Sequence, residues 1–315
     1  MDIISGWCKS QKKLVGSTAI ITGSNTGIGK ETALDLYKRG ARVIMACRNL
    51  DKAEQAQKEI QNQAKNGDSN GILIIEELDL SSLNSVRKFV ARVLASEKTV
   101  NILINNAGVM MSPEGKTTDG FETHMGTNHL GHALLTLLLL PKLIERAPSR
   151  IVTLSSYLHK SYEIDLDDLN FEKSVYDPLK AYSLSKAANV LFSKSLALHL
   201  GKHGIDNVKT YCVHPGIVRT DISRHFSDTA WYGATWAFNN IMGLFLKSAP
   251  CGAQTTIYCA VDEDCAEQTG LYYCDCHVAN TSKQCDDKEF ALKFWSRTLQ
   301  LLNVEEDNLF HNLSH

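Results

Sequence analysis

A strand, a glycine-rich turn and a helix follow one another near the N-terminus, and this order limits the possible folds more than any other feature. Residues 17–22 are apolar and β-branched, as a buried parallel strand should be. The helical pattern after the turn ends with Gly40 as a C-cap. Such glycines let the backbone approach a pyrophosphate, and the helix N-terminus offers free N–H groups. We therefore predict a dinucleotide site, with an unliganded turn as the alternative, at residues Gly23, Ser24, Asn25, Thr26, Gly27, Ile28 and Gly29.

Strand-like and helical patterns then alternate along the whole chain. The strand-like runs are residues 17–22, 41–46, 72–79, 101–105, 150–155 and 208–213, with a late run near 270–273. This alternation predicts an α/β fold: a doubly wound, Rossmann-like parallel sheet of about seven strands with helices on both faces. The absence of a repeat or a Pro-rich linker predicts one domain over residues 15–303, between an N-terminal tail (1–14) that frays and a C-terminal tail (304–315) in which Val304–Asp307 are expected to be solvated.

Composition excludes several classes of function. The net charge of −2 provides no basic field for nucleic acid. The nine cysteines lack a repeated framework, which favours a reducing, intracellular compartment. The apolar run Ala133–Leu140 is too short to span a membrane, so we expect a buried helix that Pro141 ends. Residues 1–13 lack a signal peptide, although Trp7 and its neighbouring lysines leave a peripheral membrane contact open.

The end of the second strand bears on the choice of cofactor. An acidic residue about twenty positions past the glycine turn would hold a ribose 2′-hydroxyl. Arg48 stands there instead and suits a 2′-phosphate. We therefore predict NADP(H) rather than NAD(H), with a solvated arginine as the alternative and Asp51 just beyond it as a competing signal.

Two further strand ends are expected to line the cofactor crevice, because ligands of such sheets bind beyond the carboxyl ends of the strands. Asp79 and Leu80 end the third strand, where Asp79 could meet the adenine. The fourth strand ends in Asn105, followed by Asn106, Ala107 and Gly108.

Tyr182 and Lys186 lie four residues apart in a predicted helix, so both side chains face the same side. A nearby ammonium group favours a phenolate and lowers the tyrosine pKa from about 10. Lowering this pKa by about three units needs roughly 4 kcal/mol, which one lysine seldom supplies without a second positive charge. An oxidised nicotinamide ring is such a charge, and the pair therefore predicts a nicotinamide site.

Five motifs in their order now support a family resemblance. They are Thr22-Gly23-x-x-x-Gly27-x-Gly29, Asn105–Gly108, Ser155-Ser156, Tyr182-x-x-x-Lys186 and Pro215-Gly216. With them the chain resembles the short-chain dehydrogenases/reductases over nearly its whole length. Within that family it is most similar to the retinol dehydrogenase group, on the evidence of Met45–Asn49, Asn128–His132, Val213–Val218 and Gly252–Thr255.

The resemblance implies a catalytic set of Asn128, Ser156, Tyr182 and Lys186. In this set Tyr182 is the general acid/base and Lys186 lowers its pKa and holds the nicotinamide ribose. Ser156, with Ser155 as a competitor, orients the substrate oxygen, and Asn128 holds a water that links Lys186 to solvent.

The resemblance also implies contacts around the nicotinamide and the substrate. Pro215, Gly216 and Val218 are expected near the nicotinamide, with Thr220 at its carboxamide. Residues 220–250 are rich in aromatic and apolar side chains and are expected to form a substrate lid, which suits a lipophilic alcohol or carbonyl. Plain helix packing and an interfacial membrane role remain alternatives for this segment.

Two departures from the family pattern are expected to matter. The stretch between Ser156 and Tyr182 is longer than in most soluble members and predicts an extra surface loop around Asp165, Asp167 and Asp168. The long N-terminal anchor helix of retinol-active relatives does not appear in residues 1–14, which weakens the expectation of membrane integration.

Together these features predict an NADP(H)-dependent oxidoreductase that interconverts a hydrophobic alcohol and its carbonyl, with retinol/retinal as the leading pair. The alternatives are a reductase of steroid, isoprenoid or lipid-derived carbonyls and, outside enzymes, a nucleotide-binding scaffold. The expected location is the cytoplasm or the cytosolic face of the endoplasmic reticulum, and a homo-oligomer stays open.

No metal is expected. His129 and His132 are three residues apart but lack a third ligand at suitable spacing. Cys274 and Cys276, with Cys285, lack the second Cys-x-x-Cys of a zinc site and are predicted to lie in a strand and loop at the far edge of the sheet.

Overall fold

The computed structural model describes residues 2, 5–64, 71–218 and 246–310. Its centre is an eight-stranded sheet in the order β3-β2-β1-β4-β5-β6-β7-β8. All neighbouring strands are parallel except the pair β7 and β8. The strands are β1 (Thr18–Thr22), β2 (Arg42–Cys47), β3 (Ile72–Glu77), β4 (Ile102–Asn105), β5 (Ser149–Leu154), β6 (Val208–His214), β7 (Leu271–Cys274) and β8 (His277–Val278).

The predicted doubly wound α/β fold is confirmed, and the seven predicted strands differ from the observed ones by two residues at most at either end. The sequence did not reveal β8, because two residues are too few for a periodic pattern. This strand follows a turn in which Asp275 and Cys276 both have positive φ. Cys274 thus ends β7 and Cys276 lies in the turn to the edge strand β8, in a strand and loop at the far edge of the sheet as predicted.

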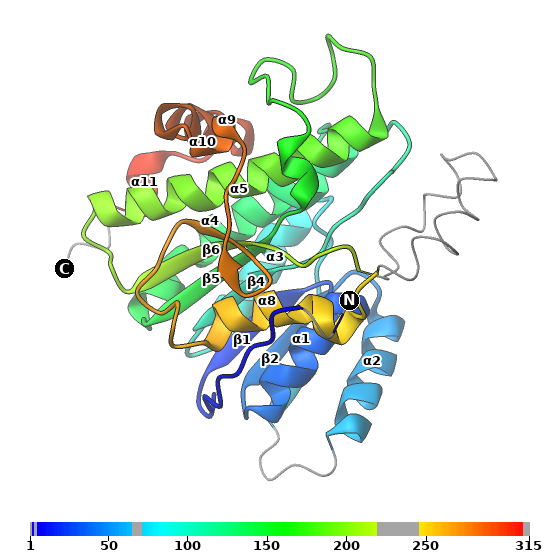
Figure 1. Cartoon of the computed structure of the whole chain (residues 1–315), viewed down its shortest axis with the longest axis vertical. Helices are drawn as coiled ribbons and strands as arrows, with labels where there is room; N and C mark the ends of the chain where they lie inside the picture. Colours follow the sequence, from blue (N-terminus) through cyan, green and yellow to red (C-terminus); the bar gives the residue numbers. More distant parts are fainter. Residues whose placement is uncertain (1, 3–4, 65–70, 219–245, 311–315) are drawn as a thin grey trace.

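Helices cover both faces of the sheet (Figure 1). One face carries α1 (Gly27–Lys38), α2 (Leu50–Gln63) and α8 (Ala249–Val261). The other carries α3 (Leu83–Ser96), α4 (Gly131–Glu145), α5 (Pro178–Lys202), α9 (Lys283–Asp286), α10 (Lys288–Leu302) and α11 (Glu306–Phe310). Successive strand side chains point to opposite faces, so Ile20 joins one core cluster while Ala19 and Ile21 join the other.

Helix α4 differs from its prediction at Pro141. The helix does not end there but continues to Glu145. Pro141 is exposed, so water can reach the position at which the missing N–H would have bonded the preceding turn. The expectation of a buried helix is otherwise met, since most of the α4 side chains are buried. Among the described residues no helix is both long and apolar enough to cross a bilayer.

The N-terminal segment does not fray as expected. The Cys8 backbone N–H donates to Gln254 on α8 at 3.2 Å. On α1, the Arg39 guanidinium donates to the carbonyls of Ser10 and Lys12 at 2.9 and 3.0 Å. Leu14 is buried in the core. This segment is therefore packed against the helices of one face.

The C-terminal segment is also more ordered than a solvated tail. It forms α11, and both Leu309 and Phe310 are buried in the core cluster of their face. The Phe310 ring stacks on His203 at 4.2 Å between ring centres. A short helix thus turns these two residues, which lie beyond the stretch expected to be solvated, back onto α5.

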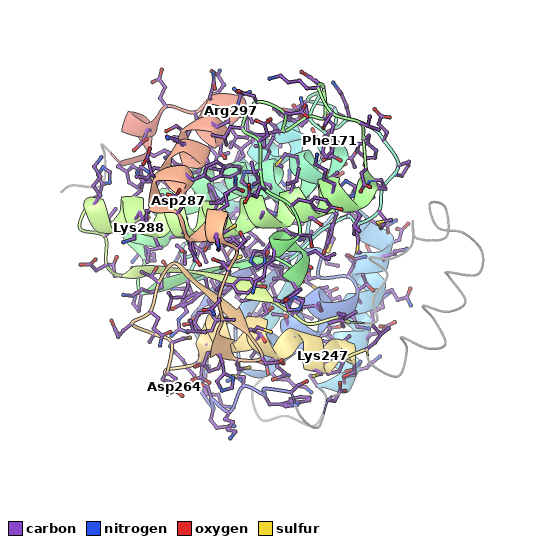
Figure 2. All side chains as sticks on the ribbon, turned by 45° about the horizontal axis from the view of Figure 1, so that its top comes forward. Phe171, Lys247, Asp264, Asp287, Lys288 and Arg297 are labelled. Carbon is purple, nitrogen blue, oxygen red and sulfur yellow. The ribbon has the colours of Figure 1, made fainter. Side chains whose placement is uncertain are left out.

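The predicted extra loop between Ser156 and Tyr182 is present. After a short 3₁₀ turn (Tyr157–Lys160), residues 161–177 form no helix or strand. Ile164 and Leu169 nevertheless reach the core, and the Arg297 guanidinium on α10 donates to the Leu166 carbonyl at 3.3 Å. Figure 2 shows Phe171 of this loop and Arg297 of α10 on the same side of the molecule.

Candidate active site

A cavity of about 960 Å³ lies beyond the carboxyl ends of the parallel strands, where such sheets bind ligands. All the predicted cofactor residues that the structure describes line it except Ser24 and Asn105. The buried Asn105 amide donates instead to the hydroxyls of Thr136 and Thr153. The Ser24 hydroxyl instead donates to the Ile21 carbonyl at 3.2 Å, and its side chain is fully buried. Thr220 and most of the expected lid lie in residues 219–245, outside the described part of the chain.

The glycine turn between β1 and α1 is shaped to leave its backbone accessible. Gly23 and Gly27 have φ values of +64° and +53°, which L side chains rarely adopt. A Cβ on Gly29 would lie 2.5 Å from both the Asn106 amide nitrogen and the Gly23 carbonyl oxygen. The start of α1 therefore packs directly on the turn, and its first residues, Gly27, Ile28 and Gly29, line the cavity, where an anion could meet the helix N-terminus.

Two cations line the cavity at the end of β2. Arg48 is joined by Lys52, which the sequence analysis missed, and both side chains are exposed. The Asn49 side chain accepts from the Lys52 backbone N–H at 2.8 Å and so begins α2 at this point. The competing acid, Asp51, does not line the cavity. Lys52 follows Arg48 by one helical turn, with the N-cap residue Asn49 between them. This spacing was the signal that could have identified Lys52.

At the other end of the cavity, Ser156 and Tyr182 come together. The Ser156 hydroxyl lies close enough to the Tyr182 phenol to lower its pKa, against the effect of burial. The Ser155 hydroxyl instead donates to the Lys186 carbonyl at 2.8 Å. Although both serines touch the cavity, this bond commits Ser155 to the backbone of α5, and Ser156 is the serine next to the phenol.

In the chain without a bound nicotinamide, burial and not Lys186 sets the direction of the Tyr182 pKa shift. The Lys186 ammonium donates to the Leu154 carbonyl at 3.1 Å and lies 5.7 Å from the centre of the Tyr182 ring. Burial lowers the pKa of Lys186 to about 8. Burial also raises the pKa of Tyr182 to about 12, and the Ser156 hydroxyl only partly opposes this shift. In this dry site desolvation outweighs a single neighbouring charge.

Asn128 lies behind the cavity wall in a π-helical segment (Met125–Leu130) that leads into α4. Its side-chain oxygen accepts from the Val109 N–H at 2.8 Å, and its amide nitrogen donates to the Val109 carbonyl and the Ser185 hydroxyl at 2.9 and 3.0 Å. A Cβ on Gly108 would lie 3.3 Å from the Asn128 side-chain oxygen and 3.5 Å from the Lys186 ammonium nitrogen. The glycine therefore keeps a side chain out of the space between Asn128 and Lys186.

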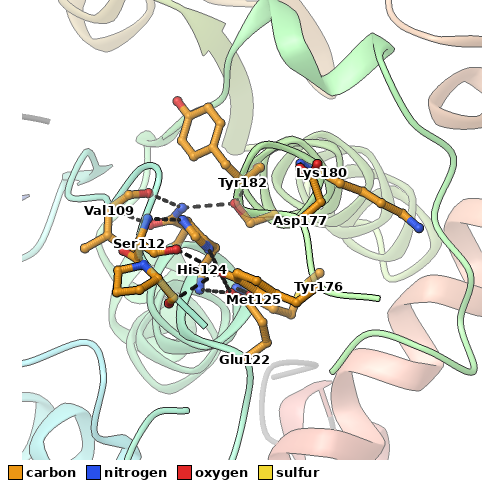
Figure 3. Close-up of polar contacts among 12 residues, drawn as sticks. Val109, Ser112, Glu122, His124, Met125, Tyr176, Asp177, Lys180 and Tyr182 are labelled. Atoms are coloured by element: carbon orange, nitrogen blue, oxygen red, sulfur yellow. Dashed lines mark hydrogen bonds and ion pairs between the residues drawn. The ribbon is translucent and has the colours of Figure 1, made fainter. Parts of the chain in front are cut away.

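A buried polar cluster beside this segment was missed by the sequence analysis (Figure 3). Glu122 accepts from the His124 imidazole at 2.7 Å, and His124 in turn accepts from the Ser112 N–H at 3.1 Å. The Tyr176 hydroxyl donates to the Ser112 carbonyl at 2.9 Å. The segment from Val109 to Ser112 is thus held at both ends. No local pattern indicates this cluster, because its members come from three separate segments.

The wall opposite the glycine turn is mostly apolar, and the sequence analysis did not identify its residues. They are Val109, Met110, Met111, Tyr157, Leu158, Ile217 and Leu246, together with His214. Lys247, just before α8 (Figure 2), forms an ion pair with Asp275. A Cβ on Gly216 would lie 2.7 Å from the Lys247 side chain, so this lysine closes the wall behind Gly216.

The histidines considered as metal ligands face different partners. The His129 ring contacts the Thr298 hydroxyl at 3.2 Å, whereas the His132 ring contacts the Thr22 hydroxyl at 2.8 Å. In the ranges that the structure covers, no three His, Cys, Asp or Glu side chains are grouped as a metal would require.

Comparisons with known proteins agree with this arrangement. The family model described as short chain dehydrogenase matches residues 17–166 and 170–231. Retinol dehydrogenase 11 from Homo sapiens is 46% identical over 303 residues, which cover 96% of this chain and 91% of that protein. Retinol dehydrogenase 13 from Homo sapiens is 42% identical over 306 residues, or 96% and 89% of the two chains. A crystal structure of an uncharacterized protein from Mycobacterium Paratuberculosis has a TM-score of 0.75 and 33% identity, covering 96% of this chain and 99% of that one.

Proposed function

Because the chain belongs to the short-chain dehydrogenase family and to its retinol dehydrogenase group, we propose that it interconverts retinol and retinal with NADP(H). At the coarser level it is an oxidoreductase of alcohols and carbonyl compounds. The observation that carries the proposal is one continuous cavity with a phosphate-binding turn at one end and the Ser156–Tyr182 pair at the other.

The proposed chemistry divides between cofactor and protein. A reduced nicotinamide supplies a hydride to the carbonyl carbon of the substrate. The Tyr182 phenol then donates its proton to the carbonyl oxygen, while the Ser156 hydroxyl donates a hydrogen bond to the same oxygen. Because burial raises the pKa of Tyr182 to about 12, the phenol keeps its proton at neutral pH. With NADPH in excess over NADP⁺, carbonyl reduction would be the working direction.

Lys186 and Asn128 have supporting roles in the proposal. The Lys186 ammonium is placed to hold the nicotinamide ribose and to add positive charge near the phenol. The space beside Gly108, between Lys186 and Asn128, is where we place the water of the proposed proton relay. Because the Asn128 amide is already bonded to Val109 and Ser185, this water has to use a remaining lone pair of an Asn128 oxygen.

The preference for NADP(H) rests on the charges at the end of β2. Arg48 and Lys52 provide two cations for a 2′-phosphate. Asp79 is the one carboxylate among the described residues that line the cavity, and its Oδ1 already accepts from the N–H and hydroxyl of Ser81. No lining carboxylate therefore stands at the end of β2 to hold a free 2′-hydroxyl.

The preference for a lipophilic substrate rests on the opposite wall. Met110, Met111, Ile217 and Leu246 offer apolar contacts, and the Tyr157 ring is largely exposed at this wall. We place the protein where such substrates dissolve, in peripheral contact with the cytosolic face of the endoplasmic reticulum. Trp7, 44% exposed in a lysine-containing N-terminal segment, supports that contact.

A substrate screen with both nicotinamide cofactors tests the proposal. Purified protein is given all-trans-retinal, a steroid ketone and a lipid aldehyde, each with NADPH and with NADH. We expect turnover of retinal with NADPH. Reduction of the other carbonyls without retinal would remove the retinoid assignment. Binding of NADPH with no turnover of any carbonyl would favour the scaffold alternative.

A further inference from the structure

His132 on α4 has no role in the chemistry above, yet it connects the two halves of the site. We propose that His132 is a positioning residue that locks the Asn106–Gly108 turn to Asn128. In this role it sets the spacing between the Asn106–Gly108 turn and Tyr182. The proposal rests on the proposed function, since it concerns the same cavity. The direction of each hydrogen bond around the His132 imidazole supports this role.

The first bond joins His132 to the end of β1. The Thr22 hydroxyl oxygen accepts from the backbone N–H groups of Asn106 and Ala107 at 2.9 and 3.0 Å, which uses both of its lone pairs. Its proton is then free to donate. The His132 Nε2 atom lies 2.8 Å away, closer than the Ile104 carbonyl at 3.4 Å. Nε2 is therefore an unprotonated acceptor.

The second bond joins His132 to the π-helical segment. The His132 Nδ1 atom lies 2.9 Å from the Asn128 carbonyl oxygen, which can only accept. Nδ1 must therefore carry the proton, and the imidazole is held neutral in one tautomer. Burial agrees with this assignment, because it lowers the pKa of His132 to about 4, with the Lys186 charge acting in the same direction.

The bonds form one continuous path between the two halves of the site. From the Asn106–Gly108 turn the path passes through Thr22 and His132 to Asn128. The Asn128 amide then donates to the Ser185 hydroxyl, which donates to the Tyr182 carbonyl at 2.7 Å. A shift of the imidazole would therefore move the Asn106–Gly108 turn relative to the turn of α5 that carries Tyr182. Displacements of about 1 Å can cost roughly 100-fold in rate.

His129 provides a matched control. It lies three residues earlier and is equally buried, at 1% exposure against 2% for His132. Burial lowers its pKa as well, to about 3. Neither histidine lines the cavity, but the His129 ring contacts Thr298 and Phe294 on α10 and Phe192 on α5 instead of Thr22 and Asn128. Replacing either histidine removes a buried imidazole from the same region. Only the replacement of His132 breaks the hydrogen-bond path from Thr22 to Asn128.

The experiment compares His132→Phe with His129→Phe in the full chain. We expect His132→Phe to lower kcat about 10- to 100-fold and to weaken NADPH binding, measured by cofactor fluorescence. His129→Phe should stay within about threefold of the wild type in both quantities, even where the two variants lose similar Tm. Equal effects of the two variants, or an unchanged kcat and Kd in His132→Phe, would overturn the proposal.

A second pair of variants covers the case in which His132→Phe does not fold. His132→Gln keeps one donor and one acceptor and should recover part of the kcat. Thr22→Val breaks the same path at its other end, so the double variant should lose less than the sum of the two single variants. Additive losses would contradict the proposal. If the wild type turned over no carbonyl, the proposed function would fail, while the Kd of NADPH would still decide the role of His132.

Discussion

The two ends of the cavity are built differently. At the proposed nucleotide end, one continuous segment, Gly23–Gly29, supplies the glycine turn, and the exposed cations Arg48 and Lys52 line the same cavity. At the reaction end, Tyr182 and Lys186 are buried, at 6% and 3% exposure, and are held by bonds from distant segments. Water screens the first set of charges and not the second. Losses at the reaction end should therefore be larger and less sensitive to salt.

The largest expected effect is at Tyr182. Tyr182→Phe removes only the hydroxyl, so it should lower kcat for carbonyl reduction about 10²- to 10⁴-fold. The Kd of NADPH should stay within about threefold, because the phenol ring remains in place. Steady-state kinetics and cofactor fluorescence measure the two quantities. A kcat close to that of the wild type would mean that another group provides the proton. The assignment of the reaction end of the cavity to Tyr182 would then be wrong.

Lys186 provides a prediction on stability and pH. Its folded pKa, lowered to about 8 by burial, lies below an unfolded value of about 10.4. Between these two pH values the unfolded chain holds the proton more often, so stability rises with pH. Relative to Lys186→Met, the wild type should gain roughly 3 kcal/mol in the free energy of unfolding from pH 8 to 10.4.

Urea unfolding of both proteins at a series of pH values measures this difference. Other buried tyrosines and cysteines titrate in both proteins and cancel in the subtraction. A flat difference would show that Lys186 is solvated in solution. The contrast between a buried and an exposed end of the cavity would then be wrong.

The smallest expected effect is at Arg48. Arg48→Ala should weaken NADPH binding about tenfold at low salt and leave NADH binding nearly unchanged, because only NADPH carries the 2′-phosphate. The loss should shrink as salt is added. Arg87→Ala, an exposed arginine on α3 that does not line the cavity, is the control. Equal weakening of both cofactors in Arg48→Ala would refute the assignment of NADP(H).

Local patterns predicted the nucleotide end well because its residues are adjacent in the chain. Ser24 and Asn105 were assigned to the wrong environment, since strand-end geometry turns their side chains into the core. The reaction end was predicted through motifs, and the choice between Ser155 and Ser156 needed the bond from Ser155 to α5. The Glu122–His124 pair and the apolar wall had no signal, because contacts between remote segments leave no periodicity.

The sequence by itself determined the order of strands and helices, the glycine turn and the helical face shared by Tyr182 and Lys186. These depend on interactions between residues a few positions apart. Only the tertiary structure decided which groups lose water and which carbonyls and hydroxyls they meet. That decision raised the Tyr182 pKa in the chain without a bound nicotinamide and gave His132 its place between Thr22 and Asn128. Desolvation and hydrogen-bond direction depend on neighbours that folding brings from elsewhere in the chain.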